Sequence, residues 1–65
     1  MKYFDTKVEM DVRVYYEQKD NLPLEICYID FLKDKKVFRW MGEIERDVIE
    51  SNLETFTKEA KKHES

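Results

Sequence analysis

Few residues of this chain could carry covalent or acid–base chemistry. Cys27 is the only cysteine and His63 the only histidine among 65 residues. A structural zinc site needs four Cys or His ligands, and a general base needs a cleft and a partner group. His63 follows the polar pair Lys61 and Lys62, so we expect a solvated side chain. The sequence therefore predicts no catalytic residue, no metal site and no cofactor.

Cys27 lies in an apolar run with no cationic neighbour in the sequence. A cysteine in that setting usually acts as a small apolar filler rather than as a nucleophile. The single glycine, Gly42, excludes a glycine-rich phosphate loop. A lone cysteine forms no disulfide within the chain and favours a reducing compartment, so we expect a cytoplasmic protein.

Carboxylates are numerous, and five of them lie close together: Glu43, Glu45, Asp47, Glu50 and Glu54. Acidic residues in the first turns of a helix compensate the helix dipole. A row of carboxylates can also imitate phosphates and occupy the basic groove of another protein. Arg46 interrupts this row, which favours the dipole interpretation.

Length and composition predict one domain spanning residues 1–65. The net charge is −3, and no apolar run reaches about 18 residues, the length that would span a membrane. The segment Met1–Asp5 lacks the apolar centre of a signal peptide. The short length, high charge density and scarcity of glycine look like those of small accessory proteins of bacteria, phages and other mobile elements.

The elements that must position any site follow from the hydrophobic pattern. Strict alternation over 3–17 predicts one long strand with a bend, a bulge or a frayed start, and Pro23 marks the entry to a second strand over 24–33. A third strand is expected over 36–41 and an amphipathic helix over 43–62. The predicted fold is α+β: a three-stranded antiparallel β-meander with one C-terminal helix packed on one face.

A two-residue turn at Asp34 and Lys35 sets the register of the second hairpin, so paired residue numbers sum to 69 and Asp30 faces Arg39. One face of the hairpin is then free of charge and suits the helix; it holds Cys27, Ile29, Phe31, Phe38 and Trp40. The expected core adds Val8, Met10, Val12, Val14, Ile44, Val48, Ile49, Leu53 and Phe56.

The opposite face keeps large apolar groups that one helix cannot cover. We interpret it as a site for another protein, made of Tyr15, Leu24, Ile26, Tyr28, Val37, Arg39 and Met41. A small regulator or inhibitor that binds a larger protein, as a homodimer, is the favoured function, and an edge strand is a second route to the dimer. Two alternatives stay open. Long basic side chains could cover the patch and keep the chain monomeric. The same face could also bind nucleic acid through Tyr15, Tyr28, Lys7, Arg13 and Arg39.

Overall fold

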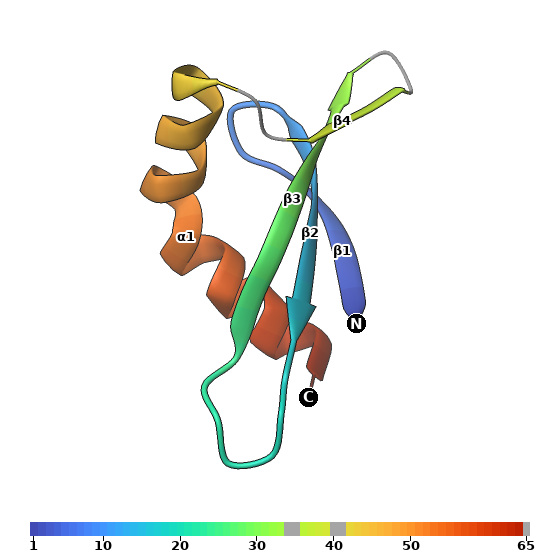
Figure 1. The fold of residues 1–65 in the computed structure, drawn as a ribbon, viewed down its shortest axis with the longest axis vertical. Helices are drawn as coiled ribbons and strands as arrows, with labels where there is room; N and C mark the ends of the chain where they lie inside the picture. The colour runs from blue at the N-terminus through green and yellow to red at the C-terminus, as the bar shows by residue number, and fades with distance from the viewer. Residues whose placement is uncertain (34–35, 40–41, 65) are drawn as a thin grey trace.

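A computed structural model describes residues 1–33, 36–39 and 42–64. Four strands form one antiparallel sheet in the order β1-β2-β3-β4, and a helix follows them (Figure 1). Their bounds are β1 Lys2–Lys7, β2 Asp11–Glu17, β3 Glu25–Lys33, β4 Lys36–Arg39 and α1 Glu43–Glu64. The α+β class, the meander and the C-terminal helix are confirmed, whereas the sheet has four strands and not three.

The extra strand comes from the stretch that alternates without interruption. The chain reverses over residues 8–10, so that Lys7 pairs with Asp11 and Phe4 with Val14. The connection contains no glycine, proline or asparagine, and its residues have negative φ. Alternation continues through it, because Val8 and Met10 pack against the same core as the strands. The expected bend is therefore a complete reversal.

The register predicted for the second hairpin is confirmed. Asp30 pairs with Arg39, Phe31 with Phe38, and Lys33 with Lys36. The predicted turn residues Asp34 and Lys35, and the residues Trp40 and Met41, lie outside the described part of the chain.

A β-bulge in β3 changes the facing of two residues that were expected on the face away from the helix. Tyr15 pairs with Tyr28, but Tyr16 pairs with Ile26, so Cys27 is an extra residue on β3. Compared with uninterrupted alternation from Tyr28, one extra residue reverses which side of the sheet the side chains before it occupy. Leu24 and Ile26 consequently pack against the core on the helix side. Their assignment to the opposite face was wrong.

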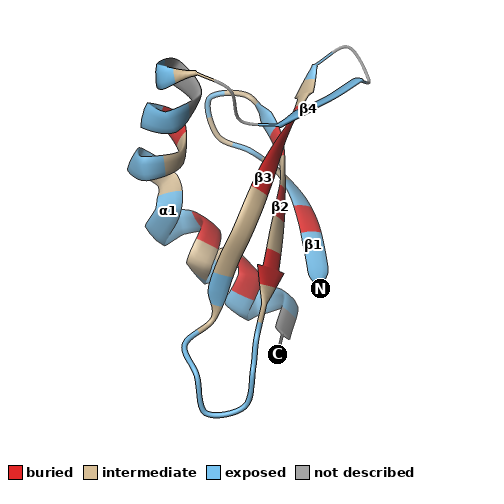
Figure 2. Cartoon of the chain, in the orientation of Figure 1, coloured by how far each residue is buried: buried red, intermediate tan, exposed pale blue. Residues whose placement is uncertain are grey.

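The core lies between α1 and one face of the sheet, as the red segments in Figure 2 show. From the helix, Val48, Phe56 and Ala60 are buried. The sheet contributes Phe4, Val12, Val14, Tyr16, Ile29 and Phe31. Six of the fourteen predicted core residues are among these buried side chains, and Val8, Met10 and Ile49 pack against the core while partly buried. Phe4, Tyr16 and Ala60 extend the predicted core.

Two predicted core residues are largely exposed. Leu53 and Phe38 each keep 46% of their surface accessible, and the side chain of Ile44 lies outside the described set. The hairpin of β3 and β4 projects away from α1 at the end of the sheet near the helix N-terminus (Figure 1), so the helix cannot cover Phe38.

The far end of the helix is tied to β1 by two contacts. The Thr6 hydroxyl donates a hydrogen bond of 3.2 Å to Oε1 of Glu59. The ring of His63 stacks on Phe4, with 5.1 Å between centroids and 15° between planes. His63 is exposed, as its sequence context predicted, and its ring also has a structural contact with Phe4.

Candidate interaction surface

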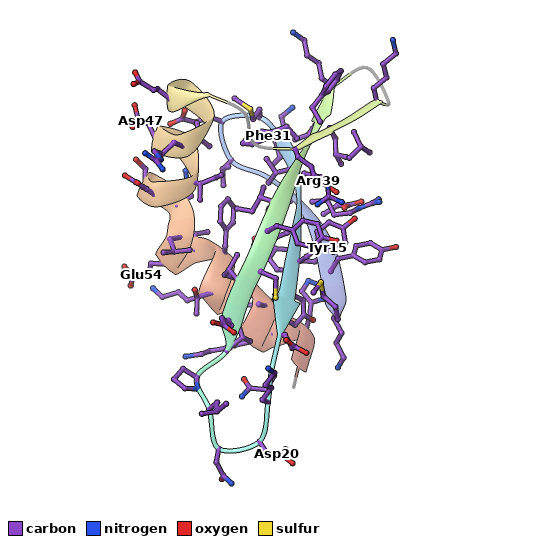
Figure 3. The ribbon with its side chains drawn as sticks, viewed as in Figure 1. Tyr15, Asp20, Phe31, Arg39, Asp47 and Glu54 are labelled. Atoms are coloured by element: carbon purple, nitrogen blue, oxygen red, sulfur yellow. The ribbon has the colours of Figure 1, made fainter. Side chains whose placement is uncertain are left out.

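The face of the sheet opposite α1, here called the helix-free face, carries two ordered rows of side chains. The first is the tyrosine row, Tyr3, Tyr15 and Tyr28, which takes one residue from each of β1, β2 and β3. Ring centroids are 5.6 Å apart between Tyr3 and Tyr15, and 4.1 Å apart between Tyr15 and Tyr28. The second pair is stacked, with 21° between the ring planes. Figure 3 shows Tyr15 and Arg39 on the side of the sheet away from the helix.

The second is the charge row, Asp5, Arg13, Asp30 and Arg39, one residue from each of the four strands. The signs alternate across the sheet. Arg13 donates from Nε to Asp5 at 2.7 Å and from Nη2 at 3.1 Å, a two-point contact. Arg39 Nη1 lies 3.8 Å from Oδ1 of Asp30. Opposite charges facing each other across strands stabilise a sheet, so the row fixes its own register.

The arginines also join the two rows together. The guanidinium carbon of Arg13 lies 4.6 Å from the ring centroid of Tyr3, and that of Arg39 lies 4.4 Å from the ring of Tyr28. Such cation–π contacts contribute about 0.5–1 kcal/mol at exposed sites. Asp30, at 3% exposure, is the one buried acidic residue of the described chain. The arginines thus cover the tyrosine row at its two ends and shield the carboxylate between them.

The ionisation of this face follows from these contacts. Loss of hydration raises the pKa of the Tyr15 phenol, and the nearby Asp30 carboxylate adds to that effect while Arg13 opposes it. Hydrogen bonds from Arg13 lower the pKa of Asp5, and the same bonds, with a smaller contribution from Tyr15, raise the pKa of Arg13. At neutral pH the helix-free face therefore presents a neutral Tyr15 phenol beside the ion pair of Asp5 and Arg13.

Three residues of the predicted protein-binding site lie together on this face, namely Tyr15, Tyr28 and Arg39. Val37 is on the same face, opposite Leu32 in the register, and is 53% exposed. Leu24 and Ile26 are on the helix side, and Met41 lies outside the described residues. Of the residues named for nucleic-acid binding, Arg13 belongs to the charge row, and Lys7 is exposed and pairs in register with Asp11.

Sequence reasoning missed Tyr3 and Asp5, which complete the two rows on β1. A signal was present, because both occupy odd positions of the alternating stretch, as Lys7, Arg13 and Tyr15 do. The reversal at residues 8–10 is what brings them beside Arg13 and Tyr15. Without that reversal, Asp5 and Arg13 would lie eight positions apart along one strand and could not form a cross-strand pair.

Cys27 has an environment that disfavours thiolate chemistry. Burial raises the pKa of its thiol, and the carboxylates of Glu17 and Glu25 raise it further. Its sulfur lies 3.8 Å from the Glu25 carbonyl oxygen, which is a weak contact. The described residues contain no group of three or more His, Cys, Asp or Glu side chains placed to hold a metal ion.

Comparison with family models, curated proteins and solved structures gave no match to this chain. Within the part of the chain that the structure describes, no helix is both long and apolar enough to cross a membrane.

Proposed function

We propose that this chain is a small protein-interaction module that binds another protein through the helix-free face. The observation that supports this most directly is the pre-ordered arrangement of three tyrosines and two arginines on a sheet face that α1 leaves uncovered. Tyrosine and arginine are enriched at the energetically dominant positions of protein interfaces. Side chains already held by neighbours lose little conformational freedom on binding, which favours affinity.

The size of the face sets the strength of the contact. Four strands about 4.8 Å apart and six residues long cover roughly 300 Å². Burying about 600 Å² over two partners contributes roughly 15 kcal/mol at about 25 cal/mol per Å². Association costs about 4–15 kcal/mol, and stable complexes bury at least about 1,200 Å². The face alone therefore supports a weak contact, and tight binding requires a larger partner that reaches beyond it.

A second copy of the chain is the first partner to consider. The charged residues on or beside the face nearly balance, since Lys7, Arg13 and Arg39 oppose Asp5, Asp11, Glu17 and Asp30. Two such faces can meet with little net repulsion. The proposal is thus a weakly self-associating cytoplasmic regulator or inhibitor whose face is also available to a larger protein.

Nucleic-acid binding on this face has less support. Bases stack on aromatic faces that point to solvent, but the ring faces of Tyr15 and Tyr28 are stacked on each other and Arg39 lies over Tyr28. Arg13 is held by Asp5 at two points and is not free to contact phosphate. A steeply salt-dependent affinity for RNA or DNA would favour this alternative instead.

Sedimentation equilibrium of the chain and two matched variants tests the proposal. Val37→Asp adds a charge on the helix-free face, and Leu22→Asp adds the same charge to the β2–β3 loop, where Leu22 is similarly exposed at 56%. We expect concentration-dependent dimers that Val37→Asp abolishes and Leu22→Asp retains. A wild-type chain that stays monomeric at millimolar concentration refutes self-association, and equal behaviour of the variants refutes the assigned face.

A further inference from the structure

A second surface lies at the end of the sheet where the β3–β4 hairpin projects beyond β1 and β2. There the side chains enclose a hollow of about 540 Å³, here called the basic notch. Its lining residues are Lys7, Met10, Asp11, Phe31, Leu32, Lys33 and Phe38. Phe31 is buried and forms part of the floor, whereas Phe38 remains 46% exposed.

The notch exists because the two hairpins end at different places. The β1–β2 pair closes at Lys7 and Asp11, while β3 continues to Lys33 and turns back into β4 at Lys36. No described strand flanks the projecting hairpin on the β2 side beyond that point. Lys33 and Lys36 lie beyond the end of the β1–β2 pair, whereas Phe38, which pairs with Phe31, is exposed because it lies on the edge strand β4.

Like charges face each other beside the notch. Lys33, which lines the notch, and Lys36, its direct cross-strand partner, are both exposed. Like charges in that position destabilise a hairpin by a few tenths of a kcal/mol or more. No carboxylate of the described residues forms an ion pair with either lysine. Asp11 is the one acidic residue in the lining, and it faces Lys7 in the register.

We propose that the basic notch receives an acidic segment of a partner protein that carries a phenylalanine or leucine side chain between carboxylates. The apolar side chain would fill the hollow between Phe31 and Phe38, and its flanking carboxylates would lie beside Lys33 and Lys36. Binding would relieve the repulsion between the two lysines. This surface is separate from the tyrosine and charge rows, so the proposal does not depend on the function proposed for them.

Reversing the charge of Lys36 distinguishes a role of the lysines in binding from a role in folding of the hairpin. Lys36→Glu turns the Lys33–Lys36 pair into an opposite-charge pair, which supports the hairpin while reversing the charge beside Lys33 of the notch lining. Lys19→Glu makes the same charge change in the β2–β3 loop, at the opposite end of the molecule in Figure 1. Across a distance greater than a Debye length of about 8–10 Å, that charge has little influence on the notch.

The probes are the blocked peptides acetyl-EFELE-amide and acetyl-KFKLK-amide, titrated into the isotope-labelled chain and followed by NMR. We expect saturable shifts of Met10, Lys33 and Phe38 with the acidic peptide only. Lys36→Glu should weaken that binding by about twofold to fivefold, as an exposed charge contact predicts, and Lys19→Glu by less than about twofold. Phe38→Ala should weaken it as well.

Several outcomes overturn the proposal. These are an absence of binding, equal binding of the basic peptide, shifts confined to the tyrosine row, or Lys36→Glu binding as tightly as wild type. Tighter binding of oligothymidylate or of phosphatidylserine vesicles at the same residues would assign the notch to phosphate groups instead. None of these results changes the sedimentation test of the helix-free face.

Discussion

The β-bulge at Cys27 makes a matched pair of substitutions diagnostic. Ile26 and Val37 are both β-branched and were expected on the same face from simple alternation. In the structure Ile26 packs against the core on the helix side, while Val37 is exposed on the helix-free face. We predict that Ile26→Asp strongly destabilises the fold and that Val37→Asp does not.

The difference can be estimated from burial. Fully burying an isoleucine side chain is worth about 1.5–3 kcal/mol, of which the partly buried Ile26 loses about half, and placing a polar group in a partly apolar site adds about 1–3 kcal/mol. Ile26→Asp should therefore cost about 2–4.5 kcal/mol. Val37→Asp loses mainly strand propensity, at most about 1 kcal/mol. A domain of this size has roughly 3–10 kcal/mol of stability in total, so Ile26→Asp removes a large share of it.

Urea unfolding followed by far-ultraviolet circular dichroism measures both effects. With a slope of about 1 kcal/mol per molar urea, Ile26→Asp should lower the midpoint by about 2–4.5 M and Val37→Asp by at most about 1 M. Ile26→Val serves as the control, because it should cost only about 0.5–1.5 kcal/mol. Equal costs for the two aspartate variants, or a larger cost for Val37→Asp, would mean that the bulge does not reverse the side chains of β3.

Three further predictions follow from other contacts. Lys36→Glu should raise stability by about 0.5–1 kcal/mol in urea unfolding, and Lys36→Gln by about half as much, because the repulsion with Lys33 is replaced or removed. A loss of stability in Lys36→Glu would contradict that repulsion. Spectrophotometric titration should show Tyr15 ionising above the ordinary phenol pKa of 10.0, so its stabilising contribution is complete below pH 10.0 and lost as the pH rises through the folded-state value. Phe56→Ala should cost about 3–5 kcal/mol by thermal or urea unfolding, since the side chain is fully buried; a cost below about 1 kcal/mol would place α1 elsewhere.

Local patterns in the sequence determined the helix and the second hairpin. Apolar residues spaced three or four apart, with acids at the start and lysines at the end, predicted a helix over 43–62, and α1 spans Glu43–Glu64. The opposite charges of Asp30 and Arg39 fit the register that the structure shows. These features depend on neighbours within one turn or one hairpin, so the sequence specifies them directly.

The helix-free face was only partly predictable. Tyr15, Tyr28 and Arg39 were identified because alternation places them away from the apolar side. Tyr3 and Asp5 were not, since their role depends on β1 pairing with β2, and nothing at residues 8–10 signals a turn by composition.

Tertiary structure alone decided the reversal at residues 8–10 and the bulge at Cys27. Alternation reports which side of a chain is apolar, but it is unchanged by a turn whose own side chains join the core, as Val8 and Met10 do. It also assumes one residue per pairing position, and Cys27 breaks that assumption. Both features arise because the sheet and the helix must close around a shared core. That requirement acts between segments far apart in the sequence, so the local pattern of neither segment reveals it.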